Sequence, residues 1–249
     1  MATFFLAAEQ LGENEINIEG DLYHHLANVL RFQVGDPIHC SDGKSICIDG
    51  HIAAIDKKRI IVTVHRRTGL IGEAPLFVTL IQCLPRGDKM ELIVRQTTEL
   101  GVGAVIPVES DNSQIRLKGK GAEKSQRWQK VADAAAEQCG RGRIPKVFAP
   151  CSLERALDML GNDTEIVFCY EKENAVGLRE KLLQVKSGSI AVLIGPEGGF
   201  SQREADLIVD RGGVSVTMGP RILRTETAGT AALAAIMYEL GDWRGMFEN

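Results

Sequence analysis

The stretch Ile194-Gly-Pro-Glu-Gly-Gly-Phe-Ser-Gln-Arg-Glu-Ala-Asp206 places glycines and prolines directly after an apolar run, residues 190–194. That run is short, continuously apolar and bounded by breakers, which predicts a strand buried on both faces of a parallel sheet. Ser201 and Glu204 have the spacing of a capping box, so we expect a helix to begin near Gln202. Because glycine carries no Cβ, a ligand can lie directly against the intervening turn. The stretch therefore predicts a strand, a ligand-binding turn and a helix, which is the repeating unit of an α/β fold.

The chain from residue 76 onward alternates apolar runs with segments of helical periodicity. Strands are expected over 76–84, 104–108, 145–148, 165–170, 190–194 and 214–218, and helices over 88–100, 123–138, 153–160, 176–184, 202–212 and 227–240. This alternation is typical of a mostly parallel sheet with helices on both faces. Ligands bind such sheets beyond the carboxyl ends of the strands, and both punctuated turns of this segment follow a strand.

Residues 1–70 follow a different pattern. A short helix over 21–30 is expected before several short β-like runs, which lie between residues 36 and 64 and are separated by turn signals. This spacing favours a small β-barrel. Residues 66–75 contain two glycines and a proline and have the composition of a linker. We therefore expect two domains, residues 1–70 and 74–249.

A second punctuated loop, Met218-Gly-Pro-Arg-Ile-Leu-Arg-Thr-Glu-Thr-Ala-Gly229, again joins a buried strand to a helix. Thr225 or Thr227 can cap that helix, whose positive amino end favours an anion or an electron-rich edge. Neither loop has the glycine spacing of a nucleotide-binding motif, and Pro196 removes an amide that a phosphate would use. Each loop alone can also be an ordinary tight connection. Two such loops facing each other would form one ligand pocket.

The composition limits the classes of function. The formal net charge is −4, so overall attraction to polyanions is not expected, although local basic clusters can still bind them. The six cysteines contain no C-x-x-C pair and the five histidines have no metal-ligand spacing, which predicts reduced thiols and no metal site. The chain shows neither a signal peptide nor a membrane span, and we expect a cytoplasmic protein.

The two loops resemble the signature loops of the RsmE family of ribosomal RNA methyltransferases, within the SPOUT superfamily. The similarity covers nearly the whole chain. It rests on residues 194–201 and 218–228, and further on Arg86-Gly-Asp-Lys-Met-Glu91, Thr98-Glu-Leu-Gly101, Glu137-Gln-Cys-Gly-Arg141, His25-Leu-Ala-Asn-Val-Leu-Arg31 and Gly35-Asp36. The loop at 218–228 is highly specific, whereas Gly-Pro-Glu-Gly-Gly also occurs in relatives that methylate other RNAs.

The resemblance implies an amino-terminal PUA-like β-barrel that binds RNA and a SPOUT-type α/β domain with a carboxyl-terminal trefoil knot. It also implies a homodimer, S-adenosylmethionine as methyl donor, and methylation at N3 of one uridine in the 16S ribosomal RNA of the small subunit. Many relatives carry an arginine just before the first strand, where this chain has Met1-Ala-Thr-Phe4. An RNA contact at that position is therefore not expected here.

Carried over position by position, the resemblance implies a donor pocket in which apolar side chains enclose adenine and backbone groups contact its edge. The resemblance implies the backbone of Leu193, Ile194, Gly195 and Gly198 with Glu197 nearby, and further Tyr170, Met218, Gly219, Ile222, Leu223, Arg224, Thr227 and Ala228. Tyr170 ends the preceding strand, and from the sequence a half-buried core position is favoured for it over a place in the pocket.

Methylation at uracil N3 requires that the N3 proton leaves. A cation near O2 or O4 stabilises the developing anion and a carboxylate can accept the proton, and Arg224 and Glu226 are the candidates for these catalytic roles. The same two residues can instead form an ion pair that stabilises the loop, or Glu226 can cap its helix.

The resemblance also suggests RNA contacts outside the pocket. These are Arg31, Arg86, Lys89, Arg141 and Arg143. Arg141 and Arg143 are flanked by glycines, and we expect these two in a mobile basic loop. Two other functions stay open from the sequence: a knotted enzyme that methylates a ribose 2′-hydroxyl of RNA, and a non-catalytic RNA-binding assembly factor of the ribosome. The segment 221–228 argues against the first, and intact glycines with Arg224 and Glu226 argue against the second.

Overall fold

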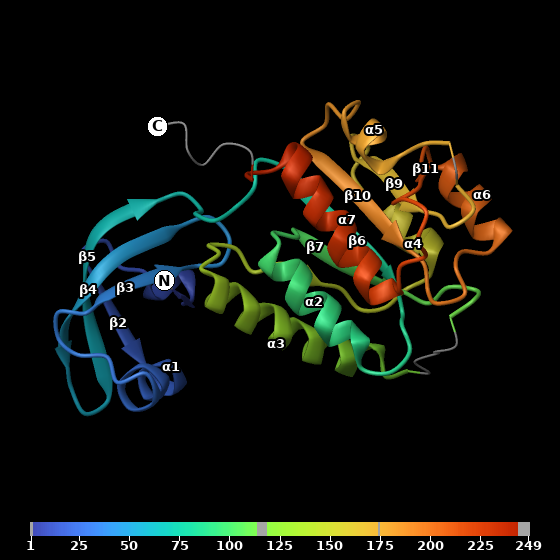
Figure 1. The fold of residues 1–249 in the computed structure, drawn as a ribbon. Helices are drawn as coiled ribbons and strands as arrows, with labels where there is room; N and C mark the ends of the chain where they lie inside the picture. Colours follow the sequence, from blue (N-terminus) through green and yellow to red (C-terminus); the bar gives the residue numbers. More distant parts are fainter. Residues whose placement is uncertain (1, 114–118, 174, 244–249) are drawn as a thin grey trace. The chain divides into compact units, whose positions relative to one another are not determined.

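The computed structural model describes residues 2–113, 119–173 and 175–243, which form two compact units (Figure 1). The first unit comprises Met1–Glu73 together with Ala136–Ile144, and the second comprises Ala74–Ala135 and Pro145–Asn249. The division expected from the sequence, 1–70 and 74–249, assigns Ala136–Ile144 to the second domain, whereas this segment belongs to the first unit. The chain returns to the first unit through tertiary contacts, which a local sequence pattern does not reveal.

The first unit is built around a five-stranded sheet with the strand order β1-β3-β4-β5-β2. Its elements are β1 (Thr3–Phe5), a 3₁₀ turn η1 (Ala8–Gln10), β2 (Glu15–Glu19), α1 (Gly20–His24), a π-helical turn η2 (His25–Val29), β3 (Pro37–Ser41), β4 (Cys47–Ile55) and β5 (Arg59–Thr68). Only the pair of β1 with β3 is parallel. The barrel expected from the sequence is thus a half-barrel sheet with β1 and β2 at its edges. Residues such as Ile16 and Ile18 alternate into its core, as the period of two requires.

Two features of this sheet differ from the sequence-based expectation. The separate β-like runs around residues 45–48 and 51–55 are one strand, β4, whose register against β5 shifts beside Gly50. A glycine is needed there because a Cβ would lie 2.5 Å from the Thr63 carbonyl oxygen. In addition, β5 continues to Thr68, into the segment expected to be a linker.

The second unit contains a six-stranded, fully parallel sheet with the strand order β11-β9-β10-β6-β7-β8. Its strands are β6 (Phe77–Cys83), β7 (Ala104–Val108), β8 (Lys146–Val147), β9 (Glu165–Cys169), β10 (Ser189–Ile194) and β11 (Val214–Val216). Its helices are α2 (Lys89–Glu99), α3 (Gly121–Cys139, whose last residues count to the first unit), α4 (Leu153–Asp158), α5 (Leu178–Leu182), α6 (Gln202–Asp210) and α7 (Thr225–Leu240). This confirms the α/β fold class expected from the alternation. The trefoil knot stays a prediction.

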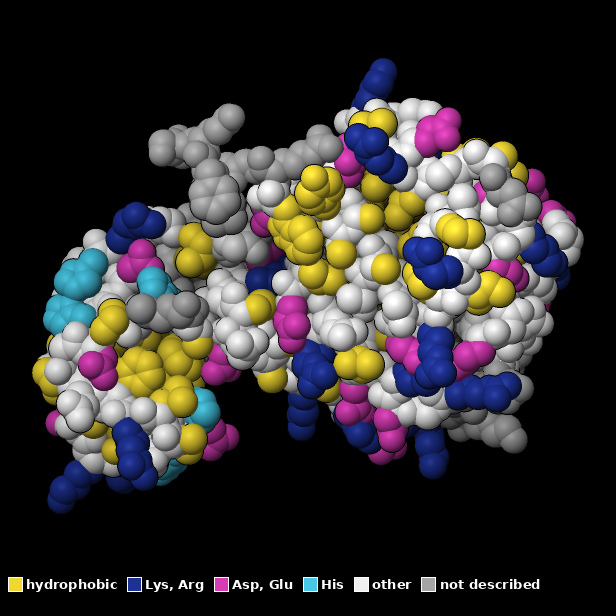
Figure 2. Space-filling model, viewed as in Figure 1, with side chains coloured by type: hydrophobic (Ala, Val, Ile, Leu, Met, Phe, Trp, Pro, Cys, Tyr) yellow, Lys and Arg dark blue, Asp and Glu magenta, His cyan; other side chains and the backbone are white. Residues whose placement is uncertain are grey.

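The surface of the second unit carries charges of both signs. On the face drawn in Figure 2, acidic and basic side chains are intermingled rather than segregated. Within the described ranges, no helix is both long and apolar enough to span a bilayer.

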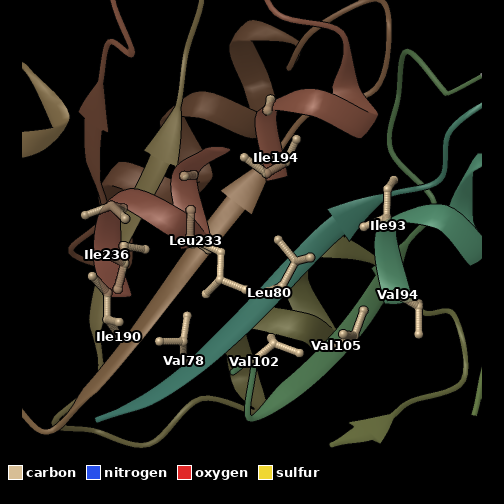
Figure 3. Packing of buried hydrophobic residues seen from close by; sticks show 14 of the residues in the cluster. Val78, Leu80, Ile93, Val94, Val102, Val105, Ile190, Ile194, Leu233 and Ile236 are labelled. Atoms are coloured by element: carbon tan, nitrogen blue, oxygen red, sulfur yellow. The ribbon is translucent and has the colours of Figure 1, made fainter. Parts of the chain in front are cut away.

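The core of the second unit lies on both faces of the sheet because side chains alternate along each buried strand. On β10, Ile190 and Ile194 pack with α2 and α7 on one face, together with Leu80 of β6 (Figure 3). Leu193 points to the opposite face, where it joins the cluster that α4 and α6 cover. The sheet is therefore covered by helices on both sides, and its strand ends are left free to form a site.

Candidate functional site

A cavity of about 490 Å³ opens at the carboxyl edge of the parallel sheet. Cys169, Ile194 and Val216 line it, and these are the last residues of the neighbouring strands β9, β10 and β11. The glycine turn, residues 195–199, and the second loop, residues 217–224, supply most of the remaining lining. The two loops singled out in the sequence thus form one pocket, at the place where open parallel sheets bind ligands.

A buried hydrogen-bond chain connects the two loops. The Thr225 hydroxyl donates to the Gly195 carbonyl oxygen at 2.7 Å and accepts from Gln82 Nε2 at 2.9 Å, and Gln82 is fully buried. Thr225 was expected as a possible cap of α7 and was not predicted as a pocket residue. The helix begins at Thr225, two residues earlier than expected, and its N-cap position is Arg224, whose side chain makes no cap hydrogen bond. The threonine side chain is therefore used to join the loops rather than to cap the helix.

The glycine turn is held from outside the pocket. Gly199 has φ +66°, which L side chains rarely adopt, and a Cβ there would collide with the Glu171 carboxylate. Asn112 Nδ2 donates to the carbonyl oxygens of Gly198 and Gly199 at 3.2 and 3.1 Å. These contacts fix a conformation that favours glycine.

The capping box predicted for the following helix is confirmed. The Ser201 hydroxyl accepts from the Glu204 amide at 3.2 Å, and the Glu204 carboxylate accepts from the Ser201 amide at 2.9 Å. Because α6 begins at Gln202, the turn is clamped between a buried strand and a capped helix.

Most of the residues implied for the donor pocket are brought together in this cavity. Its lining includes Tyr170, Ile194, Gly195, Glu197, Gly198, Met218, Gly219, Ile222, Leu223, Arg224 and Ala228. Leu193 and Thr227 are not in the lining: the side chain of Leu193, which was expected to contribute its backbone, lies on the other face of the sheet, and Thr227 is exposed on α7. That the lining residues bind the donor stays a prediction. Gly199, a glycine of the turn that the sequence predicts to bind a ligand, also lines the cavity. Sequence reasoning missed Glu171, which belongs to the loop after β9.

The Tyr170 hydroxyl is the clearest sign that the cavity takes a polar ligand. It is buried and has no hydrogen-bond partner, although buried hydroxyls are nearly always paired. Its ring lies 5.6 Å from that of Phe168, so the residue belongs both to the core and to the pocket lining. A ligand with an apolar flat ring and several polar groups, such as S-adenosylmethionine, fits the apolar side chains of the second loop and this unused hydroxyl.

The candidate catalytic residues lie beside the pocket in a cluster of charges. Lys89 Nζ, on α2, lies 3.0 Å from the Glu226 carboxylate and 3.6 Å from that of Glu197 in the glycine turn. Partial burial acts to raise the pKa of Glu226, but hydrogen bonds from its own amide and Lys89, with the charges of Lys89 and Arg224, outweigh it and lower the pKa below its ordinary value. Glu226 is thus a carboxylate held ionised between two cations. Lys89, predicted as an RNA contact, is engaged in this cluster.

The other predicted RNA contacts have different environments. Arg86 is exposed, and its amide donates to Glu197 Oε1 at 3.0 Å. Arg31 is exposed at φ +57°. Arg143 is half-buried, and its amide donates to Glu73 at 3.1 Å.

The expectation that Arg141 lies in a mobile basic loop is wrong. Its side chain is 3% exposed and pairs with Glu73 at 2.7 Å. The glycines around it were interpreted as a source of mobility, but a Cβ at Gly142 would lie 2.6 Å from Cys47 Sγ, so this glycine permits close packing. Arg141 is therefore part of the interior of the first unit.

The described part of the chain contains no group of three or more His, Cys, Asp or Glu side chains that could hold a metal ion.

Two family models match the chain, and both agree with the resemblance found in the two loops. A family model for an RNA methyltransferase domain matches residues 72–237, and one for an RNA methyltransferase PUA domain matches residues 18–64.

Individual relatives are similar along nearly the whole chain. The sequence is 34% identical over 235 residues to the ribosomal RNA small subunit methyltransferase E of Bacillus subtilis, with 92% of each chain covered. It is 33% identical to the protein of the same name from Synechocystis, covering 93% of this chain and 75% of that one. The crystal structure of a ribosomal RNA small subunit methyltransferase E from Neisseria gonorrhoeae bound to S-adenosyl methionine superposes with a TM-score of 0.85 at 31% identity, covering 98% of this chain and 99% of that one.

Proposed function

Because the chain belongs to the family of ribosomal RNA small subunit methyltransferase E, we propose that it methylates N3 of one uridine in the 16S ribosomal RNA of the small subunit. It is an RNA methyltransferase that uses S-adenosylmethionine. The observation that carries the proposal is the cavity at the carboxyl edge of the sheet, with the charged cluster of Lys89, Arg224 and Glu226 beside it.

The pocket residues hold and orient the donor. Ile194, Met218 and Leu223 supply an apolar enclosure for adenine, and the Tyr170 hydroxyl is free to bond a polar group of the ligand. The Thr225 bridge keeps the two loops at a fixed separation, so the site is formed before the ligand arrives. When bound, the donor supplies a methyl group already activated on a sulfonium, which leaves alignment and electrostatics to the protein.

The chain's own groups must manage the negative charge that develops on uracil as its N3 proton leaves. Arg224 is exposed at the amino end of α7 beside the pocket, where its guanidinium and the helix dipole both favour an anion. Glu226 is ionised at neutral pH and can accept the proton, but its lowered pKa makes it a weak base. Stabilisation of the uracil anion by Arg224 is therefore the larger contribution, and Lys89 holds the Glu226 carboxylate in place.

The assembly and location of the enzyme complete the proposal. Ile222 lines the pocket yet is 89% exposed. Tyr238 in the last turn of α7 and Trp243 just beyond the helix are also exposed. Figure 2 shows hydrophobic side chains at the surface over α7. Exposed apolar surface of this kind supports a homodimer in which the partner covers the second loop.

All six cysteines are free thiols, which supports a cytoplasmic location.

The test is methyl transfer from radiolabelled S-adenosylmethionine to small ribosomal subunits from cells that lack this protein. We expect label on one uracil base, located by nuclease digestion and mass spectrometry, and loss of label with Arg224→Met. Label on a ribose 2′-hydroxyl would replace the proposal with the second type of knotted enzyme. Absence of donor binding by calorimetry would favour the assembly factor.

A further inference from the structure

A second cavity, of about 450 Å³, opens at the amino edge of the parallel sheet. Phe77, Lys146 and Ser189 line it, and these are the first residues of β6, β8 and β10. We call it the amino-edge cavity. It shares no lining residue with the donor pocket, which opens at the other end of the strands. Its volume suits a small organic molecule. Because open parallel sheets bind their ligands at the carboxyl edge, the methyl transfer site does not account for this cavity.

The walls of the amino-edge cavity are largely apolar and include two aromatic rings. The Phe77 ring lies against the backbone of Gly103, where a Cβ would come within 2.6 Å of it. Phe77 and Met159 are 38% and 40% exposed, and Phe148 is half-buried. Aromatic rings pack well against another flat ring, and a thioether makes favourable contacts with aromatic groups. This lining therefore favours a planar aromatic ligand.

Hydrogen bonds hold the rim of the cavity in place. The hydroxyls of Thr164 and Ser189 lie 3.2 Å apart, and the Thr164 amide donates to the Gly161 carbonyl oxygen at 3.0 Å. The Ser187 hydroxyl donates to the Asp163 carbonyl oxygen at 2.6 Å. Because these contacts exist in the free protein, little conformational entropy is lost when a ligand binds.

Two charged side chains line the amino-edge cavity, Lys146 and Asp163. Lys146 Nζ lies 4.5 Å from the centroid of the Phe148 ring, so a cation stands at an aromatic face. Within the described residues, neither charged side chain forms a salt bridge, and the ammonium group is therefore available to an anion. The Asp163 carboxylate offsets the charge of the lysine, so the cavity favours a ligand with one negative charge over a polyanion such as RNA.

We propose that the amino-edge cavity binds a small molecule that has a planar aromatic ring and one anionic group, the chemical class of the aromatic carboxylates and sulfonates. The ring packs against Phe77, Phe148 and Met159, and the anionic group pairs with the Lys146 ammonium. This site is separate from those of the methyl donor and the RNA, and it does not depend on the proposed function.

The test is a fluorescence titration of the full-length protein with anilinonaphthalene sulfonate, an aromatic monoanion whose emission rises in apolar sites. The titration is run in saturating S-adenosylmethionine, so that the donor pocket is filled. Phenylnaphthylamine has the same rings without the sulfonate, and comparison of the two probes measures the contribution of the charge. We expect the wild-type protein to bind both probes.

Two variants assign the binding to the amino-edge cavity. Lys146→Gln should weaken binding of the sulfonate about threefold to fivefold and leave the uncharged probe unaffected, because it removes an exposed ion pair. Met159→Ser should weaken both probes at least about threefold, because it removes apolar contact area. Lys120→Gln and Val209→Ser change exposed residues outside the lining and are the matched controls, with both affinities unchanged. Unchanged binding of S-adenosylmethionine shows that each variant is folded.

Three results would overturn the proposal. The first is no fluorescence increase with either probe in saturating S-adenosylmethionine. The second is an equal effect of Lys146→Gln on the two probes, or no effect, since the lysine would then not pair with the anionic group. The third is unchanged binding of both probes by Met159→Ser, which would place the probes on another apolar surface.

Discussion

Replacing Glu73 with glutamine tests the structural role of Arg141. The Glu73 carboxylate accepts from Arg141 Nε at 3.0 Å, from Arg141 Nη2 at 2.7 Å and from the Arg143 amide at 3.1 Å. The two side chains are 3% and 12% exposed, so Glu73→Gln leaves a guanidinium charge buried without its counter-charge. Removal of one partner of a buried ion pair costs about 3–5 kcal/mol, and the partial exposure of Glu73 places the effect near the lower end. That is a large share of the stability of a domain of this size.

The effect should be confined to the first unit, which makes hydrogen exchange read by mass spectrometry the suitable assay. A loss of about 3 kcal/mol corresponds to roughly hundredfold faster exchange of the protected amides in β4 and β5. Amides of the second unit, such as those of β6 and β10, should exchange as before. Asp56→Asn is the control, because it breaks an exposed pair with Arg59 in the same unit and should change stability by less than about 1 kcal/mol. Equal exchange in Glu73→Gln and Asp56→Asn would refute the argument and return Arg141 to the list of RNA contacts.

Three further predictions concern the donor pocket. Gly199→Ala should weaken S-adenosylmethionine binding at least about tenfold by calorimetry, because an alanine at φ +66° strains the turn and displaces the Glu171 carboxylate, which lines the pocket. Gly188→Ala, at an exposed glycine with open space, should bind the donor normally. Tyr170→Phe should raise the donor Kd about fivefold without lowering the melting temperature, since it removes a hydroxyl that is unpaired in the free protein; a lower melting temperature with unchanged Kd would contradict this. Lys89→Met removes a cation beside Glu226 and should raise the pKa of its carboxyl group. Because the base acts in its ionised form, the acid limb of the profile of kcat against pH should move to higher pH, and Lys89→Arg should move it back. An unmoved acid limb would exclude Glu226 as the proton acceptor.

The elements of the second unit were predictable because each is encoded locally. The apolar run of β10 and the capping box at Ser201 need no information from elsewhere in the chain, and both are confirmed. Thr225 was misassigned because a threonine at a helix start satisfies the capping pattern equally well, and only the tertiary structure brings the Gly195 carbonyl to its hydroxyl. Leu193 is predicted to contribute its backbone to the pocket, so the turn of its side chain to the opposite face of the sheet leaves that prediction open.

Arg141 shows the limit most clearly. Glycine on both sides of a basic residue is typical of a flexible loop and of a tightly packed crossing alike, and the two cases differ only in what the chain meets there. Here the crossing meets Cys47 and Glu73, which lie far away in sequence. Only the three-dimensional structure distinguishes a flexible loop from a tightly packed crossing at this position.

The hydrogen bonds of Thr225 also determine when the donor pocket forms during folding. Gln82, Gly195 and Thr225 come from β6, the glycine turn and α7, so the pocket is complete only when α7, the last helix of the described residues, has docked. Synthesis proceeds from the amino terminus, and domains fold as units while the chain emerges. A nascent chain therefore gains its affinity for the methyl donor only after α7 has docked against β6 and the glycine turn.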